Sequence, residues 1–565
     1  MPLSRREFLI DGLATGAFSP VLGSAGHRGR GGKHSGYPFQ HGVASGDPLT
    51  DAIILWTRVT PARTSSASGY SSVPGYPSVM GYQWLVATDR SLKDVVASGE
   101  GLTDASRDFT VKIDVRGLSP GREYFYAFYS RGHWSDTGRF KTLPEDDIEH
   151  LRIAFTSCSN YAAGYFNVYR ELALQSDLDV ILHLGDYIYE YASIDESLQT
   201  GRLHEPLKET VTLADYRARH ACYKADKDSQ AVHRQHAFIA IWDDHEVANN
   251  AWQGGAANHQ DYQGDWSERL NAAVQAYYEW MPVREITHTG RLALYRGYRF
   301  GNLLDLSVLD TRLAGRDAPE TSPDAIADSQ RTLLGFEQEA WLESRLINAQ
   351  QEDVTWKLLG QQVMMGQFGF QDQPFNYDQW DGYPAARQRL FDVIRDNDIT
   401  GWGVLTGDIH SSWAMTLHDD PFESLQQPLG FELVTPAVTS KGIGSRAAGE
   451  FAGASLMQVL PHLNFVDFYY RGYVLLDITH ERLQAQWWVV DRVDSPRYET
   501  ACLRTLEVTP DSPEFSEAEP VIADSSGADA PVASLRAFSD ELAYLREWSA
   551  GGEVIPEGMV ALHHP

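Results

Sequence analysis

The chain has 565 residues, which is too long for one ordinary hydrophobic core, so we expect two or more domains. Its apolar and charged fractions, 43% and 22%, are typical of a globular protein. The formal net charge of −30 argues against a nucleic-acid partner, because no basic surplus exists to neutralise phosphates. No run of about 20 uninterrupted apolar residues occurs, so no membrane-spanning helix is predicted. An anionic substrate would need a local positive centre of metal ions or a few arginines.

The first residues have the pattern of a twin-arginine export signal. Two arginines lie in the stretch Ser4–Leu9, a mildly apolar stretch follows, and small residues at 23–25 offer a cleavage site. We interpret residues 1–36 as this signal and a mobile segment, with the mature protein beginning near Gly26. The alternative is a disordered basic N-terminus. The interpretation places the protein in the periplasm or outside the cell, with the twin-arginine export machinery as a partner.

The three cysteines are Cys158, Cys222 and Cys502. This odd number allows at most one disulfide and leaves at least one free thiol. An exported protein built on disulfides usually has an even and denser set of cysteines, so no disulfide scaffold is expected. Whether Cys222 and Cys502 pair stays open at this point.

Residues 39–143 are predicted to form a fibronectin- or immunoglobulin-like β-sandwich domain. Short stretches rich in β-branched and aromatic residues alternate here with turn residues. A turn at 118–121 before Tyr124 is typical of the last hairpin of such a sandwich. We find no chemistry-bearing motif in this domain and expect it to pack against a catalytic domain or to shape access to it. The predicted strands span residues 53–59, 82–87, 109–115 and 124–129.

Residues 150–502 follow an acidic boundary at 144–149 and alternate apolar strands with helical stretches. This alternation predicts an α/β sandwich of two mixed β-sheets flanked by helices. Residues 503–565 are predicted to be an acidic extension rich in Pro, Ser and Ala, with a solvated linker at 510–531 and a short helix at 534–548. The predicted strands of the α/β region are 151–156, 180–184, 237–242, 303–309, 356–359, 403–407, 429–433, 473–478 and 483–490, and its predicted helices are 165–176, 267–280 and 388–396.

Polar residues follow four predicted strands of the α/β region. The stretch 180–184 is apolar except for His183, which suits a buried strand, and Gly185 permits a turn that places Asp186 at the strand's carboxyl end. Tyr189 follows three residues later and can return toward the same point. The other three strand ends carry Cys158, then Asp243, Asp244 and His245, and then Asp408 and His410.

Each of these residues also has a structural interpretation. Asp186 and Asp244 could cap helices, Tyr189 could pack on the sheet, and Cys158 could be a small buried hydrophobic residue. His410 could be a loop histidine with ordinary hydrogen bonds. Taken together, so many anions and imidazoles at one rim of a sheet require cations to neutralise them. We therefore predict a metal site.

These motifs resemble those of the calcineurin-like metallophosphoesterase superfamily, and their particular forms resemble the PhoD-type alkaline phosphatases. The resemblance covers about residues 39–500, and the twin-arginine pattern agrees with it. It implies a metallophosphoesterase-like α/β sandwich preceded by the N-terminal β-sandwich. The motifs that carry it are Ser157-Cys158-Ser159-Asn160, Gly185-Asp186-Tyr187-Ile188-Tyr189, Trp242-Asp243-Asp244-His245-Glu246 and Gly407-Asp408-Ile409-His410, together with 41–48, 276–284, 309–312 and 380–383.

The resemblance implies a phosphatase centre containing Fe(III) and Ca²⁺. This sequence departs from the broader superfamily, because Cys158, Asp244 and Asp408 replace the usual Asp-x-His, Asn and His. Tyr189 matches the tyrosine whose phenolate holds ferric iron in purple acid phosphatases. One set of ligands, suited to Fe(III), would be Cys158, Asp186, Tyr189 and His410, and a second set, suited to Ca²⁺, would be the bridging Asp186 with Asp244 and Asp408.

The implied activity is hydrolysis of phosphate monoesters, with phosphodiesterase activity, through direct attack by metal-bound hydroxide. His245 is the candidate for contacting the substrate or protonating the leaving alkoxide. Asn160 and Arg312 are candidate phosphate contacts, although Arg312 is equally compatible with a structural ion pair. Asp243 is expected to support Asp244 rather than to bind metal. No serine or threonine lies where a covalent phosphoenzyme would be expected.

Two other functions stay open from the sequence. The protein could be primarily a phosphodiesterase or a phospholipase D-like hydrolase, since the width of the pocket decides between these substrates. It could also be a non-catalytic phosphate-binding export protein, although that function predicts a broken set of ligands. We expect a monomer that acts on small phosphate esters and has neither a nucleic-acid-binding surface nor a transmembrane anchor.

Overall fold

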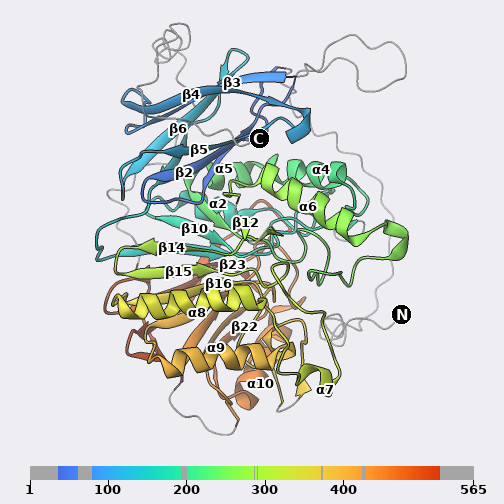
Figure 1. Ribbon diagram of the computed structural model, residues 1–565, viewed down its shortest axis with the longest axis vertical. Helices are drawn as coiled ribbons and strands as arrows, with labels where there is room; N and C mark the ends of the chain where they lie inside the picture. The colour runs from blue at the N-terminus through green and yellow to red at the C-terminus, as the bar shows by residue number, and fades with distance from the viewer. Residues whose placement is uncertain are drawn as a thin grey trace.

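The computed structural model describes residues 36–61, 79–192, 200–285, 287–288, 291–370, 373–422 and 428–521. The predicted export signal and the predicted helix at 534–548 lie outside the described residues. In Figure 1 the N-terminal strands form the upper part of the molecule, and the strands and helices of the α/β region follow below them.

The first large sheet has ten strands in the order β26-β25-β24-β23-β9-β10-β11-β1-β2-β5. Strands β9, β10, β11 and β1 run parallel to one another, whereas β23 is antiparallel to β9. Their bounds are β1 Val43–Gly46, β2 Ala52–Arg58, β5 Thr110–Arg116, β9 Leu151–Thr156, β10 Val180–His183, β11 Ala237–Ala240, β23 Arg471–Ile478, β24 Leu483–Val490, β25 Thr500–Thr509 and β26 Ser512–Glu517.

The second large sheet has seven strands in the order β14-β15-β16-β19-β21-β20-β22. Strands β15, β16, β19 and β21 are parallel, and the others pair antiparallel, so both large sheets are mixed as predicted. The bounds are β14 Arg296–Phe300, β15 Leu304–Val308, β16 Trp356–Gln361, β19 Trp402–Thr406, β20 Ser412–Leu417, β21 Gly430–Val434 and β22 Leu463–Asp467.

The helices lie beside these sheets, and α8 and α9 run side by side in the lower half of Figure 1. The predicted helices at 165–176, 267–280 and 388–396 correspond to α2, α6 and α9, whereas α4, α5, α7, α8 and α10 were not predicted. Among the described residues, no helix has both the length and the apolar character that crossing a membrane requires. The bounds are α2 Asn167–Leu174, α4 Leu213–Lys224, α5 Lys227–Gln235, α6 Trp266–Trp280, α7 Pro323–Ile326, α8 Phe336–Gln351, α9 Pro384–Asp396 and α10 Arg446–Val459.

The N-terminal region contains a smaller five-stranded sheet that packs over β2 and β5. Its order is β4-β3-β6-β7, with β8 also paired to β6, and the Tyr124 hydroxyl accepts a hydrogen bond from the Ser119 N–H at 2.9 Å as in a fibronectin-type corner. This β-rich domain agrees with the predicted fold, and it is joined to the α/β region because β1 pairs in parallel with β11, with Ser45 opposite Ala237. The bounds are β3 Val79–Ala87, β4 Val95–Asp104, β6 Glu123–Ser130, β7 His133–Trp134 and β8 Gly138–Lys141.

The C-terminal boundary also differs from the prediction. The expected end of the catalytic domain at 502 falls inside β25, and the expected linker from 510 begins as the turn of the β25–β26 hairpin. The Pro510 carbonyl accepts a hydrogen bond from the Gly401 N–H at 2.9 Å. The proline-rich, acidic composition indicated a solvated linker, but buried Leu506 and Val508 hold this hairpin on the sheet.

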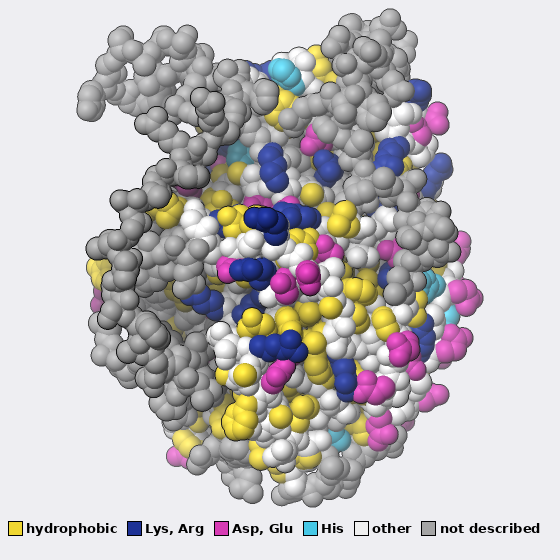
Figure 2. All heavy atoms as spheres, turned by 180° about the vertical axis from the view of Figure 1, so that it is seen from behind, with side chains coloured by type: hydrophobic (Ala, Val, Ile, Leu, Met, Phe, Trp, Pro, Cys, Tyr) yellow, Lys and Arg dark blue, Asp and Glu magenta, His cyan; other side chains and the backbone are white. Residues whose placement is uncertain are grey.

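The opposite face of the molecule, seen in Figure 2, carries charges of both signs. Lysine and arginine side chains are interspersed there with acidic and hydrophobic ones.

A buried polar cluster joins β1 to the second large sheet. Asp47 follows β1 and is buried, and its Oδ1 accepts hydrogen bonds from Arg296 Nη2 and from the Tyr298 hydroxyl, both at 2.7 Å. Its Oδ2 accepts the Arg284 N–H at 2.6 Å. Because Arg296 and Tyr298 belong to β14, this carboxylate connects the first sheet to the second.

Replacing this carboxylate should lower the stability of the whole protein. Asp47→Ala leaves the buried Arg296 guanidinium without its anion, which typically costs about 3–5 kcal/mol. We expect a clear fall in the urea midpoint of unfolding, followed by circular dichroism. The control is Glu450→Ala, which removes the exposed Arg446–Glu450 pair and should change stability by less than about 1 kcal/mol. Equal midpoints for the two variants would contradict the role given to Asp47.

Candidate metal centre

Loops that follow parallel strands of both large sheets meet at one place. Hydrogen bonds join the first two loops, from the Cys158 N–H to the Gly185 carbonyl at 3.1 Å and from the Ser159 N–H to the Asp186 carbonyl at 2.9 Å. The loop after β19 approaches so closely that a Cβ on Gly407 would lie 2.9 Å from the Ser157 side chain. The carboxyl ends of β9, β10, β11 and β19 therefore face one site, as predicted for an α/β fold.

Four candidate ligands in these loops have left-handed backbone conformations. The φ angles are 62° at Cys158, 54° at Asp186, 60° at Asp408 and 60° at His410. Such conformations are unfavourable for residues with a Cβ, and they concentrate at functional sites where the surrounding structure enforces them. Here they follow strand ends and turn the four side chains toward the same space.

The candidate ligand atoms form three overlapping groups, and within each group all the atoms lie within 4.8 Å of one another. The groups share carboxylates, so one acidic side chain can serve two neighbouring positions. They are Cys158 with Asp186 and His410, Asp186 with Asp244 and His245, and Asp243 with Asp244 and Asp408.

Tyr189 joins the first of these groups. Its hydroxyl donates to Asp186 Oδ2 at 2.7 Å and lies 3.1 Å from His410 Nε2. Ser440 Oγ lies 2.7 Å from the same phenolic oxygen and also donates to the Cys158 carbonyl at 2.9 Å. The structure thus brings together the four residues predicted to hold iron. It also shows Ser440, which the sequence analysis missed because nothing near it in sequence marks the site.

The acidic side chains of the site need compensating charge. Burial, and then the charges of neighbouring carboxylates, raise the pKa values of Asp186 and Asp243 well above their usual range. Burial, followed by the charge of Asp186, also raises the pKa of the Cys158 thiol. Oδ2 of Asp243 is buried and has no hydrogen-bond partner among the described residues. Thiol, phenol, imidazole and several carboxylates therefore fit bound metal cations as ligands.

Arg312 lies among these carboxylates. Its guanidinium pairs with Asp243, with Asp378 at 2.7 Å and with Asp408 at 3.1 Å, and the side chain is fully buried. Although burial opposes its charge, the carboxylates of Asp243 and Asp378 raise the pKa of Arg312. These contacts favour the ion-pair interpretation of Arg312 over a phosphate contact. Asp243 accordingly acts at least as the partner that holds this guanidinium in place.

The other predicted phosphate contact, Asn160, lies in the loop after β9. It is 5% exposed, and its Oδ1 accepts a hydrogen bond from the Ala162 N–H at 3.1 Å. The Asn160 carbonyl accepts a hydrogen bond from Thr439 Oγ1 at 2.7 Å. The loop is therefore well anchored, and contact of Asn160 with phosphate stays a prediction.

His245 is held by a carboxylate that the sequence analysis did not assign. Its Nδ1 lies 2.7 Å from Glu190 Oε2, and Glu190 Oε1 accepts hydrogen bonds from the Asn249 N–H and from Asn258 Nδ2. The His245 ring stacks on the Tyr189 ring with 4.2 Å between centroids. Burial alone would lower the pKa of His245, but the Asp244 and Glu190 carboxylates raise it well above its usual value.

Glu246 is a second missed residue that organises the site. Its carboxylate accepts backbone N–H groups from Asp186 at 3.1 Å, Tyr187 at 2.5 Å and Asp243 at 2.8 Å. Burial is the main cause that raises the pKa of Glu246 to about 7. One side chain thus fixes the loops after β10 and β11 relative to each other. The sequence showed an acidic residue here, but its role depends on contacts across about 60 residues.

Comparisons with known proteins agree with this geometry. A sequence model of the PhoD-like phosphatase matches residues 153–487, and a model of the PhoD-like phosphatase N-terminal domain matches residues 26–144. The chain belongs to the PhoD-like phosphatase family. The sequence resemblance is therefore confirmed, and the protein is a phosphatase.

The chain is similar to individual members of this family along most of its length. Alkaline phosphatase D of Bacillus subtilis (strain 168) is 36% identical over 480 residues, which cover 82% of this chain and 79% of that protein. A solved structure of PhoD has a TM-score of 0.75 and 31% identity, and the match covers 92% of this chain and 99% of that one. Both matches extend over most of this chain, so the fold of this PhoD-like phosphatase is confirmed.

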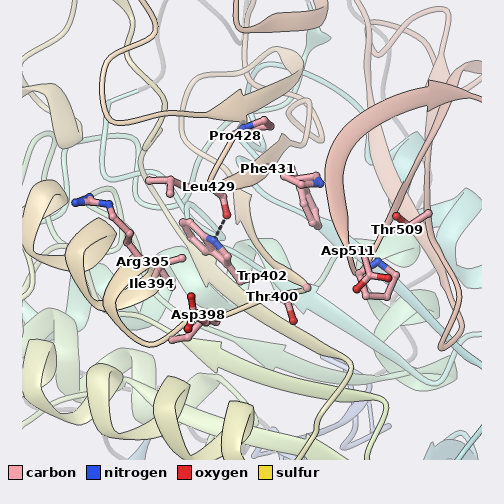
Figure 3. A pocket seen from close by; sticks show the side chains of 14 residues that line it. Ile394, Arg395, Asp398, Thr400, Trp402, Pro428, Leu429, Phe431, Thr509 and Asp511 are labelled. Carbon is pink, nitrogen blue, oxygen red and sulfur yellow. Dashed lines mark hydrogen bonds between the residues drawn. The ribbon is translucent and has the colours of Figure 1, made fainter. Parts of the chain in front are cut away.

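A cavity of about 280 Å³ lies at the other end of the second sheet. Trp402 begins β19 and lines this cavity, whereas Asp408 of the candidate metal centre follows the end of the same strand. Figure 3 shows Trp402 beside Phe431, with the Trp402 indole N–H donating to the Leu429 carbonyl. None of the predicted site residues lines this cavity, so it is separate from the metal centre.

Helix α4 of this PhoD-like phosphatase holds the backbone of Tyr189. The Tyr223 hydroxyl accepts the N–H of Tyr189 at 3.2 Å and the N–H of Tyr161 at 3.0 Å. Arg219, on the same helix, donates to the Tyr189 carbonyl. Because Tyr161 follows Asn160, a single phenol connects the loop after β9 to the loop after β10.

Removing this phenol should lower the catalytic activity more than the stability of the fold. Tyr223→Phe removes the acceptor of the buried Tyr189 N–H and of the partly buried Tyr161 N–H, and an unpaired buried N–H costs about 1–3 kcal/mol. We expect kcat for p-nitrophenyl phosphate to fall about tenfold or more, since small displacements of catalytic groups have large effects. The control is Tyr473→Phe, which removes another buried hydroxyl whose contact is with Gln175 at 3.4 Å. Equal kcat values in the two variants would contradict the role of Tyr223.

Proposed function

We propose that this protein is an exported alkaline phosphatase that hydrolyses phosphate monoesters, with some activity on diesters, at an Fe(III)–Ca²⁺ centre. The observation that carries the proposal is the position of Asp186. Its carboxylate belongs to a group with the thiol of Cys158 and the imidazole of His410, and also to a group with Asp244 and His245. One proposed set of ligands contains a sulfur and a nitrogen atom, and the other consists mainly of carboxylate oxygens. A carboxylate shared by both sets suits a pair of different metal ions.

The proposed ligands divide by chemistry. Cys158, Tyr189 and His410 would hold Fe(III) together with Asp186, and Asp244 and Asp408 would hold Ca²⁺ together with the same bridge. When bound, such ions neutralise the phosphoryl oxygens of the substrate and lower the pKa of water. Ser440 would keep the phenolic oxygen of Tyr189 oriented, since the two oxygens are 2.7 Å apart.

His245 is the proposed proton donor for the leaving alkoxide. Glu190 holds its Nδ1, so the remaining nitrogen, Nε2, is the atom that would exchange a proton with the substrate. Stacking on Tyr189 fixes the plane of the imidazole. Glu190 therefore acts as a positioning residue that sets both the tautomer and the orientation of His245.

Arg312 supports the acidic side of the site. Its contacts with Asp243 and Asp408 partly balance their negative charges and fix the orientation of both carboxylates. Export by the twin-arginine pathway and a monomeric state complete the proposal. The arginine pair in Ser4–Leu9 supports the export pathway.

The proposal can be tested with two substrates and a chelator. Purified protein should hydrolyse p-nitrophenyl phosphate faster than bis-p-nitrophenyl phosphate, and elemental analysis should find iron and calcium. Removing the metals should abolish both activities, and Asp186→Asn should lose both metals, because it removes the shared ligand. The matched control is Asp392→Asn, a partly exposed residue of α9 that should keep metals and activity.

The outcomes separate the alternatives. Faster hydrolysis of the diester would favour the phosphodiesterase or phospholipase D-like alternative. Inactivity on both esters after loading with iron and calcium would favour the non-catalytic alternative and reject the proposal.

The role of His245 predicts a dependence on the leaving group. His245→Gln should slow hydrolysis of glycerol 3-phosphate about 10²-fold or more, because an alkoxide must be protonated as it leaves. Hydrolysis of p-nitrophenyl phosphate should fall much less, since p-nitrophenolate leaves without a proton. Glu190→Gln should produce a smaller change in the same direction. Equal losses on the two substrates in steady-state assays would reject His245 as the proton donor.

A further inference from the structure

The segment that supplies Asp186 and Tyr189 also places an aromatic ring at the rim of the site. Tyr191 is 37% exposed, whereas Tyr187 and Tyr189 of the same segment are almost completely buried. The Tyr191 ring meets the His245 ring edge-on, with 5.0 Å between centroids and 65° between the planes. Tyr191 therefore contacts the proposed proton donor and is also accessible from outside.

The backbone of Tyr191 is fixed from the protein side. Its carbonyl lies 3.1 Å from His204 Nδ1, and His204 Nε2 lies 3.2 Å from the Tyr223 hydroxyl. Glu190, the preceding residue, is fully buried and bonded to His245. An aromatic ring on so well anchored a backbone loses little conformational freedom when a ligand packs against it.

The surroundings of His245 determine where a leaving group can lie. Tyr189 covers one face of the imidazole, and Glu190 occupies its Nδ1. A leaving group must approach the remaining part of the ring to receive a proton, and the partly exposed Tyr191 contacts this same ring.

We infer that Tyr191 forms one wall of a leaving-group subsite and that this subsite favours phosphate esters of aromatic alcohols over those of small alkyl alcohols. The inference rests on the proposed function, because it takes His245 as the proton donor. Offset or edge-to-face packing of two aromatic rings contributes enough to change affinity by about twofold to tenfold. Such packing is possible for a phenyl or similar ring and not for a glycerol or ethyl group.

The experiment compares KM and kcat for phenyl phosphate and glycerol 3-phosphate in the full-length, metal-loaded protein. Tyr191→Ala and Tyr191→Leu should lower the ratio of kcat/KM for phenyl phosphate to kcat/KM for glycerol 3-phosphate about threefold to tenfold, mainly through a higher KM for phenyl phosphate. Tyr191→Phe keeps the ring and should behave like the wild type. The matched control is Tyr262→Ala, because Tyr262 is 85% exposed and is not among the aromatic contacts of His245.

A binding measurement makes the test independent of turnover. Wild-type protein should bind phenylphosphonate more tightly than methylphosphonate, and Tyr191→Leu should lose most of this difference. Parallel losses on both esters, or an unchanged preference for the phenyl ligands in the Leu variant, would overturn the subsite while leaving the proposed function standing. A wild-type protein inactive on both esters would overturn the proposed function and this subsite with it.

Discussion

The burial of several carboxylates at one point is the constraint on which the rest of this structure depends. Asp186, Asp243 and Asp244 are completely buried and Asp408 nearly so, and Arg312 contacts three of these four. One guanidinium cannot balance four buried carboxylates, since each unpaired charge in a protein interior is strongly unfavourable. Metal cations bound at this point would offset these charges, and under the proposed function the same cations would supply the positive charge that a phosphoryl group requires. Under the proposed function, the stability of these loops and catalysis therefore both depend on positive charge beside the buried carboxylates.

Hydrogen bonds from several parts of the fold hold the loops that carry these carboxylates. Glu246 binds the backbone of the loops after β10 and β11, and Tyr223 binds that of the loops after β9 and β10. Cys158 and Asp186 keep left-handed backbone conformations within these loops. Such conformations persist only where the surrounding structure enforces them.

A single short segment supplies several different functions. Asp186 provides the shared carboxylate, Tyr189 the phenol, Glu190 the carboxylate that orients His245, and Tyr191 the exposed ring beside it. These residues follow β10 directly, so the buried strand fixes where their side chains lie. Because the segment curls around His245, consecutive residues contact different parts of the same imidazole.

The sequence by itself determined the fold class, many of the strands and the strand ends that carry the candidate ligands. Apolar runs that end in polar residues predict parallel strands with a site at their carboxyl ends, and Cys158, Asp186, Tyr189 and His410 do lie together. Only the tertiary structure showed that β1 extends the catalytic sheet and that the sheet continues to β26. It also decided the surroundings of Arg312 and revealed Glu190, Glu246 and Tyr223 as organising residues. The physical reason is the range of the interactions: strand character and turn residues act over a few positions, whereas these pairings join side chains and backbone groups tens to hundreds of residues apart.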